Sequence, residues 1–277
     1  MYKAVFIDID GTLRDNNKNI SNKTIATIKN LTNNGILVIL CTGRPRKYTE
    51  DISRKCHASK YIITSNGGSI YNYEENKIIY ENIMNKKACI KLYEIAKQAD
   101  VRFIMNVGDI RVVDRLKCLD GSEIKLKTDI EKFVNENNVL QCTIADENYE
   151  KIKNLRKYID EIENVEIKNQ HKSLIDCNES KQGTIFYDVA NIESSKGNAI
   201  EKFCRRLNIN LKDTIAIGDG ENDISMFKVV GYSVVMKNAN DTVKKYADEI
   251  TASNEDDGVA VFLEKLLRIT REREDLK

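Results

Sequence analysis

The chain has 277 residues, 41% of them hydrophobic and 31% charged, and this composition excludes a fibrous protein and a largely disordered one. At roughly 150 residues per domain, the length predicts about two domains. Lysine and arginine (44) almost balance aspartate and glutamate (43). The net charge of +1 therefore gives no field that would attract a nucleic acid or an anionic membrane, and we expect neither as a partner.

Targeting signals and cysteines point to the cytoplasm. The longest apolar run, residues 36–41, is far shorter than the roughly 20 residues of a transmembrane helix. The N-terminal apolar run meets Asp8 and Asp10 too soon for a signal peptide. The seven cysteines are odd in number and include no Cys-x-x-Cys pair, which favours buried thiols in a reducing compartment. We therefore expect a cytoplasmic protein.

The N-terminal part of the chain predicts a strand, a helix and a second strand. Residues 3–9 form an apolar, β-branched run typical of a buried parallel strand. Ser21 is a candidate N-cap for a helix over residues 22–33, which Gly35 would end. Residues 36–41 predict the next strand, and this order implies a right-handed crossover in a parallel sheet. The fold class is therefore α/β.

The C-terminal part repeats this alternation and can complete the same sheet. Helices are expected over residues 196–207 and 222–229, and strands over residues 214–217 and 233–236.

The middle of the chain has a different pattern. It combines a predicted hairpin over residues 102–113, a strand over 139–145, and charged helical patterns over 86–99 and 148–162. We predict an inserted α+β domain at residues 84–188, a typical domain size. Residues 1–83 and 189–277 would then form one discontinuous core domain.

The first of four short motifs, Asp8-Ile9-Asp10-Gly11-Thr12, ends the first predicted strand. Open parallel sheets place ligand-binding residues at this end. Side chains two apart on a strand share a face, so both carboxylates could point into one site. A turn with two solvated acids is the alternative. A calcium loop fits less well, because it would need a later glycine and flanking helices.

The next two motifs offer groups for an anion. Thr42-Gly43-Arg44 follows the second predicted strand, where a hydroxyl and backbone N–H groups could bind a phosphoryl oxygen. Lys196 opens a predicted helix, where its ammonium group and the helix N-terminus both favour an anion. Taken singly, Thr-Gly is most simply a turn, and a lysine is most simply a solvated surface group.

The fourth motif, Gly218-Asp219-Gly220-Glu221-Asn222-Asp223, again lies between a strand and a helix. Its carboxylates and amide are the hard oxygen ligands that magnesium prefers, with an acidic loop as the alternative. All four motifs fall at a strand end or a helix start, so one crevice could collect them. Together they supply a nucleophile, a proton donor, phosphoryl-binding groups and metal ligands.

With these motifs in this order, the sequence resembles the haloacid dehalogenase (HAD) superfamily, specifically its Cof-type phosphatases, the IIB subfamily. The long interval from Thr42 to Lys196 leaves room for an inserted cap domain, which is where this subfamily has one. The resemblance implies a Rossmann-like core, with a parallel sheet flanked by helices, and an α+β cap that closes over the substrate.

By this resemblance, Asp8 is the nucleophile that forms an aspartyl-phosphate, and Asp10 is the acid that protonates the leaving oxygen and then activates water. Asp8, the backbone carbonyl of Asp10 and Asp219 would hold Mg²⁺, and Asp223 would support the metal shell. The groups expected at the phosphoryl oxygens are Thr42, Gly43, Arg44, Lys196 and Asn222. Asn66, in a Ser-Asn-Gly-Gly loop that resembles the one bordering the family's pocket, is a candidate substrate contact, with an ordinary turn as the alternative.

The sequence thus predicts a Mg²⁺-dependent phosphatase of small phosphorylated metabolites, with sugar phosphates implied by the resemblance. A phosphomutase or phosphotransferase is one alternative, in which the aspartyl-phosphate passes to a sugar hydroxyl instead of to water. A non-catalytic sensor of a phosphorylated metabolite is another, although it would not need both Asp8 and Asp10. The sequence gives no account of Arg14.

Overall fold

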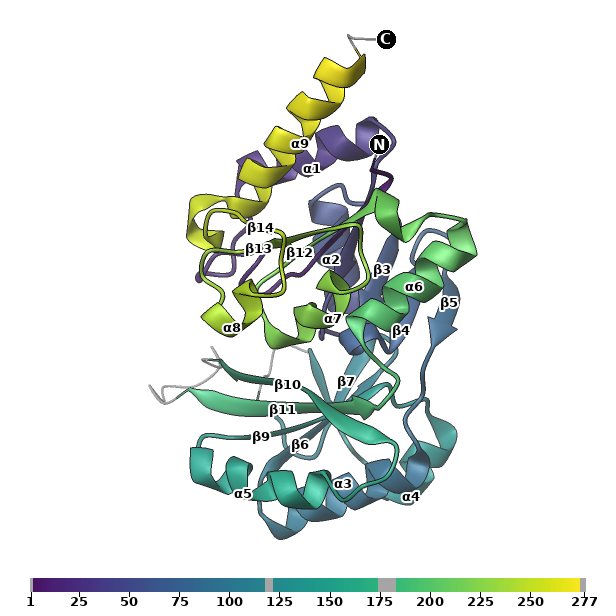
Figure 1. The fold of residues 1–277 in the computed structure, drawn as a ribbon. Helices are drawn as coiled ribbons and strands as arrows, with labels where there is room; N and C mark the ends of the chain where they lie inside the picture. The colour runs from purple at the N-terminus through teal and green to yellow at the C-terminus, as the bar shows by residue number, and fades with distance from the viewer. Residues whose placement is uncertain (1, 118–121, 174–182, 275–277) are drawn as a thin grey trace. The chain divides into compact units, whose positions relative to one another are not determined.

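The computed structural model describes residues 2–117, 122–173 and 183–274, and Figure 1 shows their elements. They fall into two compact units. Unit 1 comprises Met1–Thr42, Thr49–Tyr80 and Ser195–Lys277, and unit 2 comprises Gly43–Tyr48 and Glu81–Ser194. The domain boundaries expected after residues 83 and 188 stay predictions.

An eight-stranded sheet with the order β14-β13-β12-β1-β2-β3-β4-β5 forms the centre of unit 1. Its strands pair in parallel from β14 to β3, and β4 pairs antiparallel with β3. The strands are β1 (Ala4–Ile7), β2 (Leu37–Cys41), β3 (Tyr61–Thr64), β4 (Ser69–Asn72), β5 (Lys77–Glu81), β12 (Thr214–Gly218), β13 (Tyr232–Val235) and β14 (Glu249–Ile250).

Helices cover both faces of this sheet, which explains why its central strands are apolar throughout. On one face, Val5 and Ile7 of β1 pack with residues of α1 (Asn22–Asn33) and α9 (Gly258–Glu274). On the other face, Phe6 packs with residues of α6 (Lys196–Leu207). The remaining helices are α2 (Arg46–Lys55), α7 (Ile224–Phe227) and α8 (Asp241–Lys244), with short 3₁₀ turns η1 (Ser65–Gly67), η2 (Leu211–Asp213), η3 (Glu221–Asp223) and η4 (Asn254–Asp256).

Unit 2 is built on a six-stranded mixed sheet with the order β10-β11-β9-β6-β7-β8, antiparallel except for the β7–β8 pair. Three helices cover one face, and residues such as Leu92, Met105 and Ile144 form the core between the helices and the sheet. The elements are β6 (Arg102–Val107), β7 (Ile110–Val113), β8 (Glu123–Lys125), β9 (Gln141–Asp146), β10 (Val165–Ser173), β11 (Thr184–Asn191), α3 (Lys86–Gln98), α4 (Ile130–Glu136) and α5 (Tyr149–Ile159).

The structure confirms the predicted α/β class, with a mainly parallel core sheet and an inserted α+β part. The Ser21 side chain caps α1 by accepting a hydrogen bond from the Thr24 backbone nitrogen at 3.0 Å, as the pattern predicted. The helix predicted over residues 222–229 is shorter, because η3 takes its first turn and α7 ends at Phe227.

Three further sequence expectations can be compared with the described residues. Five cysteines are buried and unpaired (Cys41, Cys56, Cys89, Cys142 and Cys204), whereas Cys118 and Cys177 lie outside the described ranges. Within those ranges, no helix has the length and apolar character needed to cross a bilayer. Arg14 now has a structural account, because its Nε donates to the Lys18 carbonyl at 2.7 Å and steadies the loop after Asp10.

Candidate active site

Asp8 follows β1 directly and lies at the carboxyl end of the parallel sheet of unit 1. Its backbone nitrogen donates to the Ile217 carbonyl at 3.0 Å, which ties it to the end of the neighbouring strand β12. The residue is only 6% exposed. Asp10, two residues further on, is exposed. The first motif therefore presents one buried and one accessible carboxylate, and these are two different environments for acid chemistry.

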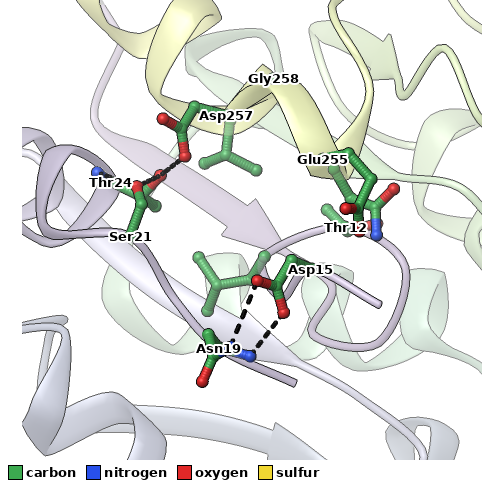
Figure 2. A pocket seen from close by; sticks show the side chains of 11 residues that line it. Thr12, Asp15, Asn19, Ser21, Thr24, Glu255, Asp257 and Gly258 are labelled. Atoms are coloured by element: carbon green, nitrogen blue, oxygen red, sulfur yellow. Dashed lines mark hydrogen bonds between the residues drawn. The ribbon is translucent and has the colours of Figure 1, made fainter. Parts of the chain in front are cut away.

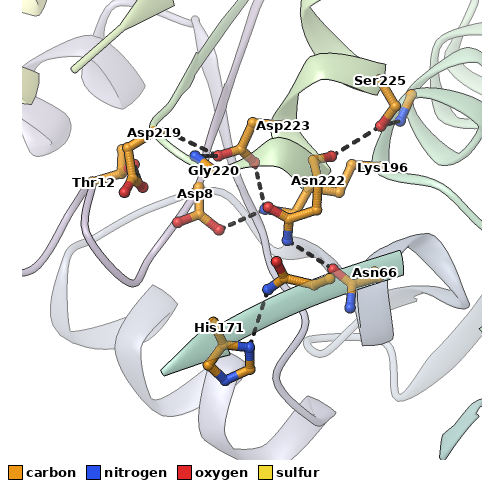
Figure 3. Close-up of polar contacts among 12 residues, drawn as sticks. Asp8, Thr12, Asn66, His171, Lys196, Asp219, Gly220, Asn222, Asp223 and Ser225 are labelled. Carbon is orange, nitrogen blue, oxygen red and sulfur yellow. Dashed lines mark hydrogen bonds and ion pairs between the residues drawn. The ribbon is translucent and has the colours of Figure 1, made fainter. Parts of the chain in front are cut away.

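Lys196 brings two of the motifs together. It is the first residue of α6, which the side chain of Ser195 caps. Its Nζ lies 2.6 Å from Asp8 Oδ1 and 2.6 Å from Asp223 Oδ1, and its side chain is 0% exposed (Figure 3). A solvated surface lysine, the alternative left open by the sequence, is thus excluded.

The fourth motif holds Asp223 firmly. Its Oδ2 accepts hydrogen bonds from the backbone nitrogens of Asp219 and Gly220, both at 2.9 Å. Its Oδ1 is bound to Lys196, so both oxygens of this carboxylate have donors. Asp219 is held differently, because its Oδ1 accepts a hydrogen bond from the Thr12 hydroxyl at 2.7 Å. Thr12 is a residue of the first motif to which the sequence assigned no role.

We call Asp8, Lys196, Asp219 and Asp223 the Lys196 cluster. It holds three carboxylates against one ammonium group. Burial raises the pKa of Asp8 well above its usual range, although the adjacent Lys196 opposes this shift. Burial and repulsion from Asp223 raise the pKa of Asp219 to about 7. Burial alone would lower the pKa of Lys196, but attraction to Asp223 and Asp8 outweighs it and raises that pKa.

The excess of negative charge makes the cluster a candidate cation site. Asp8, Asp219 and Asp223 each offer a carboxylate oxygen, and these oxygens all lie within 4.8 Å of one another. Hard oxygen donors suit Mg²⁺ and similar divalent ions. Burial is the main cause of the raised pKa of Asp219, and repulsion from Asp223 adds to it. The residues present therefore fit a divalent cation. Asp10 is not in this group of side chains, and the predicted contact of its backbone carbonyl stays a prediction.

Three of the predicted phosphoryl or substrate contacts also belong to unit 1. Thr42, 2% exposed, ends the β2 region, and its carbonyl accepts a hydrogen bond from the Asn66 nitrogen at 3.0 Å. Asn222 Nδ2 donates to Asn66 Oδ1 at 2.9 Å (Figure 3). Gly43 and Arg44 belong to unit 2, where the Arg44 guanidinium lies 5.2 Å from the centre of the Tyr48 ring. Their predicted roles at the phosphoryl group stay predictions.

A polar pocket of about 210 Å³ adjoins the first motif at Thr12 (Figure 2). Two of its acidic side chains accept hydrogen bonds from backbone nitrogens nearby. Glu255 Oε1 accepts from the Asn16 nitrogen at 2.6 Å, and Asp15 Oδ1 accepts from the Asn19 nitrogen at 2.7 Å. The Asn254 side chain donates to the Arg14 carbonyl at 3.0 Å. These bonds anchor the loop that follows Asp10.

At the carboxyl end of a parallel sheet, a buried lysine contacts carboxylates of the first and fourth motifs, an arrangement that suits phosphoryl transfer. Comparison with known proteins agrees. The family model for haloacid dehalogenase-like hydrolases matches residues 5–263. A putative phosphatase of Buchnera aphidicola is 30% identical, with 96% of each chain covered. The 5-amino-6-(5-phospho-D-ribitylamino)uracil phosphatase YwtE of Bacillus subtilis is 28% identical, again with 96% of each chain covered. A haloacid dehalogenase-like hydrolase from Bacteroides thetaiotaomicron has a TM-score of 0.78 at 25% identity, covering 96% of this chain and 100% of that one.

The chain therefore belongs to the haloacid dehalogenase-like hydrolases, and it is a phosphatase of that family. The resemblance seen in the motifs, including the Cof-type subfamily, is confirmed.

Proposed function

We propose that this phosphatase hydrolyses small phosphorylated metabolites through an aspartyl-phosphate on Asp8, with Mg²⁺ bound beside it. The observation that carries the proposal is the buried contact of 2.6 Å between Lys196 Nζ and Asp8 Oδ1, at the carboxyl end of a parallel sheet. Burial raises the pKa of Asp8, and a lysine in that position opposes this rise and attracts a phosphoryl dianion.

In the first step, a carboxylate oxygen of Asp8 attacks phosphorus and the bond from phosphorus to the ester oxygen breaks. Asp10 gives its proton to the departing oxygen, which leaves as an alcohol. The exposed position of Asp10 suits this exchange, whereas buried Asp8 is shielded from water. Thr42, Lys196 and Asn222 are the unit 1 groups that we propose for the oxygens of the transferring phosphoryl group.

In the second step, water attacks phosphorus of the aspartyl-phosphate. Asp10, now a carboxylate, accepts the proton from that water, and the bond from phosphorus to Asp8 breaks. Inorganic phosphate leaves and Asp8 returns to its carboxylate form. One residue thus serves as acid and then as base, so Asp10 begins each turnover protonated and regains its proton at the end.

The cation site fits this reaction. Asp8 and Asp219 would hold Mg²⁺, with Asp223 held in place by Lys196 and two backbone N–H groups. When bound, the ion offsets the repulsion between the carboxylates and the phosphoryl group. The raised pKa of Asp219 is consistent with a site whose charge is balanced only when a cation is present.

For the substrate, we propose a small phosphate monoester of a polyol or sugar. The relatives support this class, since one of them is a phosphatase of a phosphoribityl compound. The sugar phosphates implied by the motif resemblance belong to the same chemical class.

Phosphate release from sugar phosphates, a phosphoribityl compound and a generic aryl phosphate tests the proposal. We expect turnover with Mg²⁺, none with EDTA, and none in Asp8→Asn, which preserves the shape of the side chain but not its charge. Product analysis separates the alternatives: isomerised sugar phosphate would indicate a mutase, and binding without turnover a sensor. Either result would contradict the proposal.

A further inference from the structure

The loop between β3 and β4 has an unusual backbone. Ser65, Asn66 and Gly67 have φ values of 52°, 53° and 88°, so three successive residues lie in the left-handed region. For residues with a side chain this conformation is strained. Such strain persists only where the surroundings hold it, and it is concentrated at functional sites. The contacts of the turn therefore need an explanation.

Those contacts join three of the four motifs. The Asn66 nitrogen donates to the Thr42 carbonyl at 3.0 Å. A Cβ on Gly67 would overlap the carbonyl oxygen of Ser195, the N-cap of the helix that begins with Lys196. The Asn66 side chain accepts the hydrogen bond from Asn222 (Figure 3). The turn is thus fixed against the second, third and fourth motifs within unit 1.

The bond to Asn222 has a chemical consequence. A carboxamide can present either its NH₂ or its carbonyl oxygen to a neighbour, and only the NH₂ is attractive to a phosphoryl oxygen. In the structure Asn66 presents its Oδ1, which can only accept, and Asn222 Nδ2 points toward that oxygen. Asn222 Oδ1 then lies against Gly220, where an added Cβ would be 2.7 Å away. The second N–H of the same nitrogen remains for an anion.

We propose that Asn66 is a positioning residue that fixes the orientation of the Asn222 carboxamide, so that an N–H and not a carbonyl oxygen faces the phosphoryl group. The inference rests on the proposed function, in which Asn222 binds a phosphoryl oxygen. It assigns Asn66 a different role from the direct substrate contact predicted from the sequence. Asn66 acts through Asn222, and its backbone strain is what places its side-chain oxygen there.

A double-mutant cycle separates the two roles, with binding of inorganic phosphate in the presence of Mg²⁺ measured by calorimetry. Loss of one hydrogen bond to a charged group weakens binding roughly 10- to 100-fold, and we expect this for Asn222→Ala. We expect about a tenfold loss for Asn66→Ala. In the double variant we expect the Asn66 replacement to cause no additional loss, so phosphate affinity should equal that of Asn222→Ala alone. Losses that multiply in the double variant would overturn the inference.

Two controls separate the side chain from the backbone. Asn66→Gly suits a positive φ but removes the acceptor, so we expect it to bind phosphate as weakly as Asn66→Ala. Recovery of wild-type affinity in Asn66→Gly would mean that backbone strain alone was responsible. Asn208, the left-handed C-cap of α6 with φ 55°, is the matched control, and Asn208→Ala should leave phosphate affinity unchanged.

The outcomes also distinguish this inference from the proposed function. A wild-type protein that neither binds phosphate with Mg²⁺ nor releases it from any monoester would contradict both. A wild-type protein that turns over substrate, together with multiplying losses in the cycle, would contradict only the role of Asn66 and would restore direct contact with the substrate.

Discussion

Each unit of the molecule buries ionic side chains, and the two sets differ in their charge balance. In unit 2, Arg102 of β6 and Glu123 of β8 form an ion pair with side chains 5% and 4% exposed. Within this pair the two charges cancel, and the Arg111 guanidinium of β7 interacts electrostatically with both members. In unit 1, Lys196 faces Asp8 and Asp223, with Asp219 beside them. That set has an excess of negative charge, which a bound cation or a proton can balance.

The difference distinguishes an ion pair that stabilises the fold from a group of ionic side chains suited to catalysis. The Arg102–Glu123 pair joins two strands that flank β7, and the Lys117 nitrogen adds a hydrogen bond to Glu123 Oε2 at 3.2 Å. Such a pair is complete, and apolar side chains of similar volume often replace one at little cost. The Lys196 cluster is incomplete without a cation, and perturbed carboxylates of this kind are concentrated at functional sites. Charge imbalance therefore favours the Lys196 cluster as the candidate reactive set.

The largest expected effect is on catalysis. Asp8→Asn should lower kcat by at least about a thousandfold, because the amide cannot form the acyl-phosphate. The double replacement Arg102→Met/Glu123→Leu should keep kcat within about threefold, since it removes a complete pair far from the chemistry along the chain. Phosphate-release assays on an aryl phosphate measure both. Comparable losses of kcat in the two variants would contradict the distinction between the Lys196 cluster and the Arg102–Glu123 pair.

Stability should change in opposite directions at the two sets. Glu123→Gln leaves Arg102 without its counter-charge and should cost about 3–5 kcal/mol of unfolding free energy. Asp8→Asn should instead stabilise the protein in EDTA at pH 8, because the raised pKa of Asp8 means that folding disfavours its ionised form. Urea unfolding of both variants measures the signs. Destabilisation by Asp8→Asn would show that the attraction between Lys196 and the Asp8 carboxylate outweighs the cost of burying that carboxylate.

The motifs and their gathering could be predicted from the sequence, whereas several contacts could not. Residues 3–9 and the Ser21 cap are local patterns, and a parallel sheet brings strand ends together, so Asp8, Lys196 and Asp219 could be expected in one place. The Arg102–Glu123 pair depends on the register of β6 and β8 on β7, and the spacing of residues in the sequence does not predict that register.

A contact of the site and two strands of unit 2 were not predicted from the sequence. The Asn66–Asn222 bond depends on left-handed φ values in the β3–β4 loop, and the sequence there reads as an ordinary Gly-Gly turn. The strand β10 was not predicted, because Val165–Ser173 carries polar and charged residues without a clear alternation. The strand β11 was also missed, although Thr184–Asn191 begins with an apolar and aromatic run. The Asn66–Asn222 bond and the pairing of β10 both depend on contacts between residues that lie apart in the sequence.

Cation binding should stabilise the protein through the Lys196 cluster and not through the Arg102–Glu123 pair. Saturation of the site at about 100 times its dissociation constant stabilises the fold by about 2.7 kcal/mol. We expect Mg²⁺ to raise the melting temperature of the wild type and of Glu123→Gln by similar amounts, and to have little effect on Asp219→Asn. Calorimetric melting with and without Mg²⁺ makes the comparison. An unchanged response in Asp219→Asn would place the ion elsewhere.

The smallest expected effect concerns pH. The pKa of Asp219 is about 7 in the folded protein, against an ordinary value of 3.8. Between these values the folded chain holds a proton that the unfolded chain has lost, so stability without metal rises as pH falls from 7 toward 4. The slope is at most about 1.4 kcal/mol per pH unit. Unfolding of wild type and Asp219→Asn in EDTA at pH 5 to 8 measures it, and parallel curves would contradict the raised pKa.

The most direct test of the central claim is to trap the phosphorylated enzyme. An activated aryl phosphate needs little help from an acid to leave, so Asp10→Asn should form the acyl-phosphate but hydrolyse it slowly. After rapid mixing with Mg²⁺ and an acid quench, peptide mass mapping should find one phosphoryl group on Asp8 in Asp10→Asn and none in Asp8→Asn. Phosphate release without any phosphoryl group on Asp8, or with one on another residue, would contradict the account.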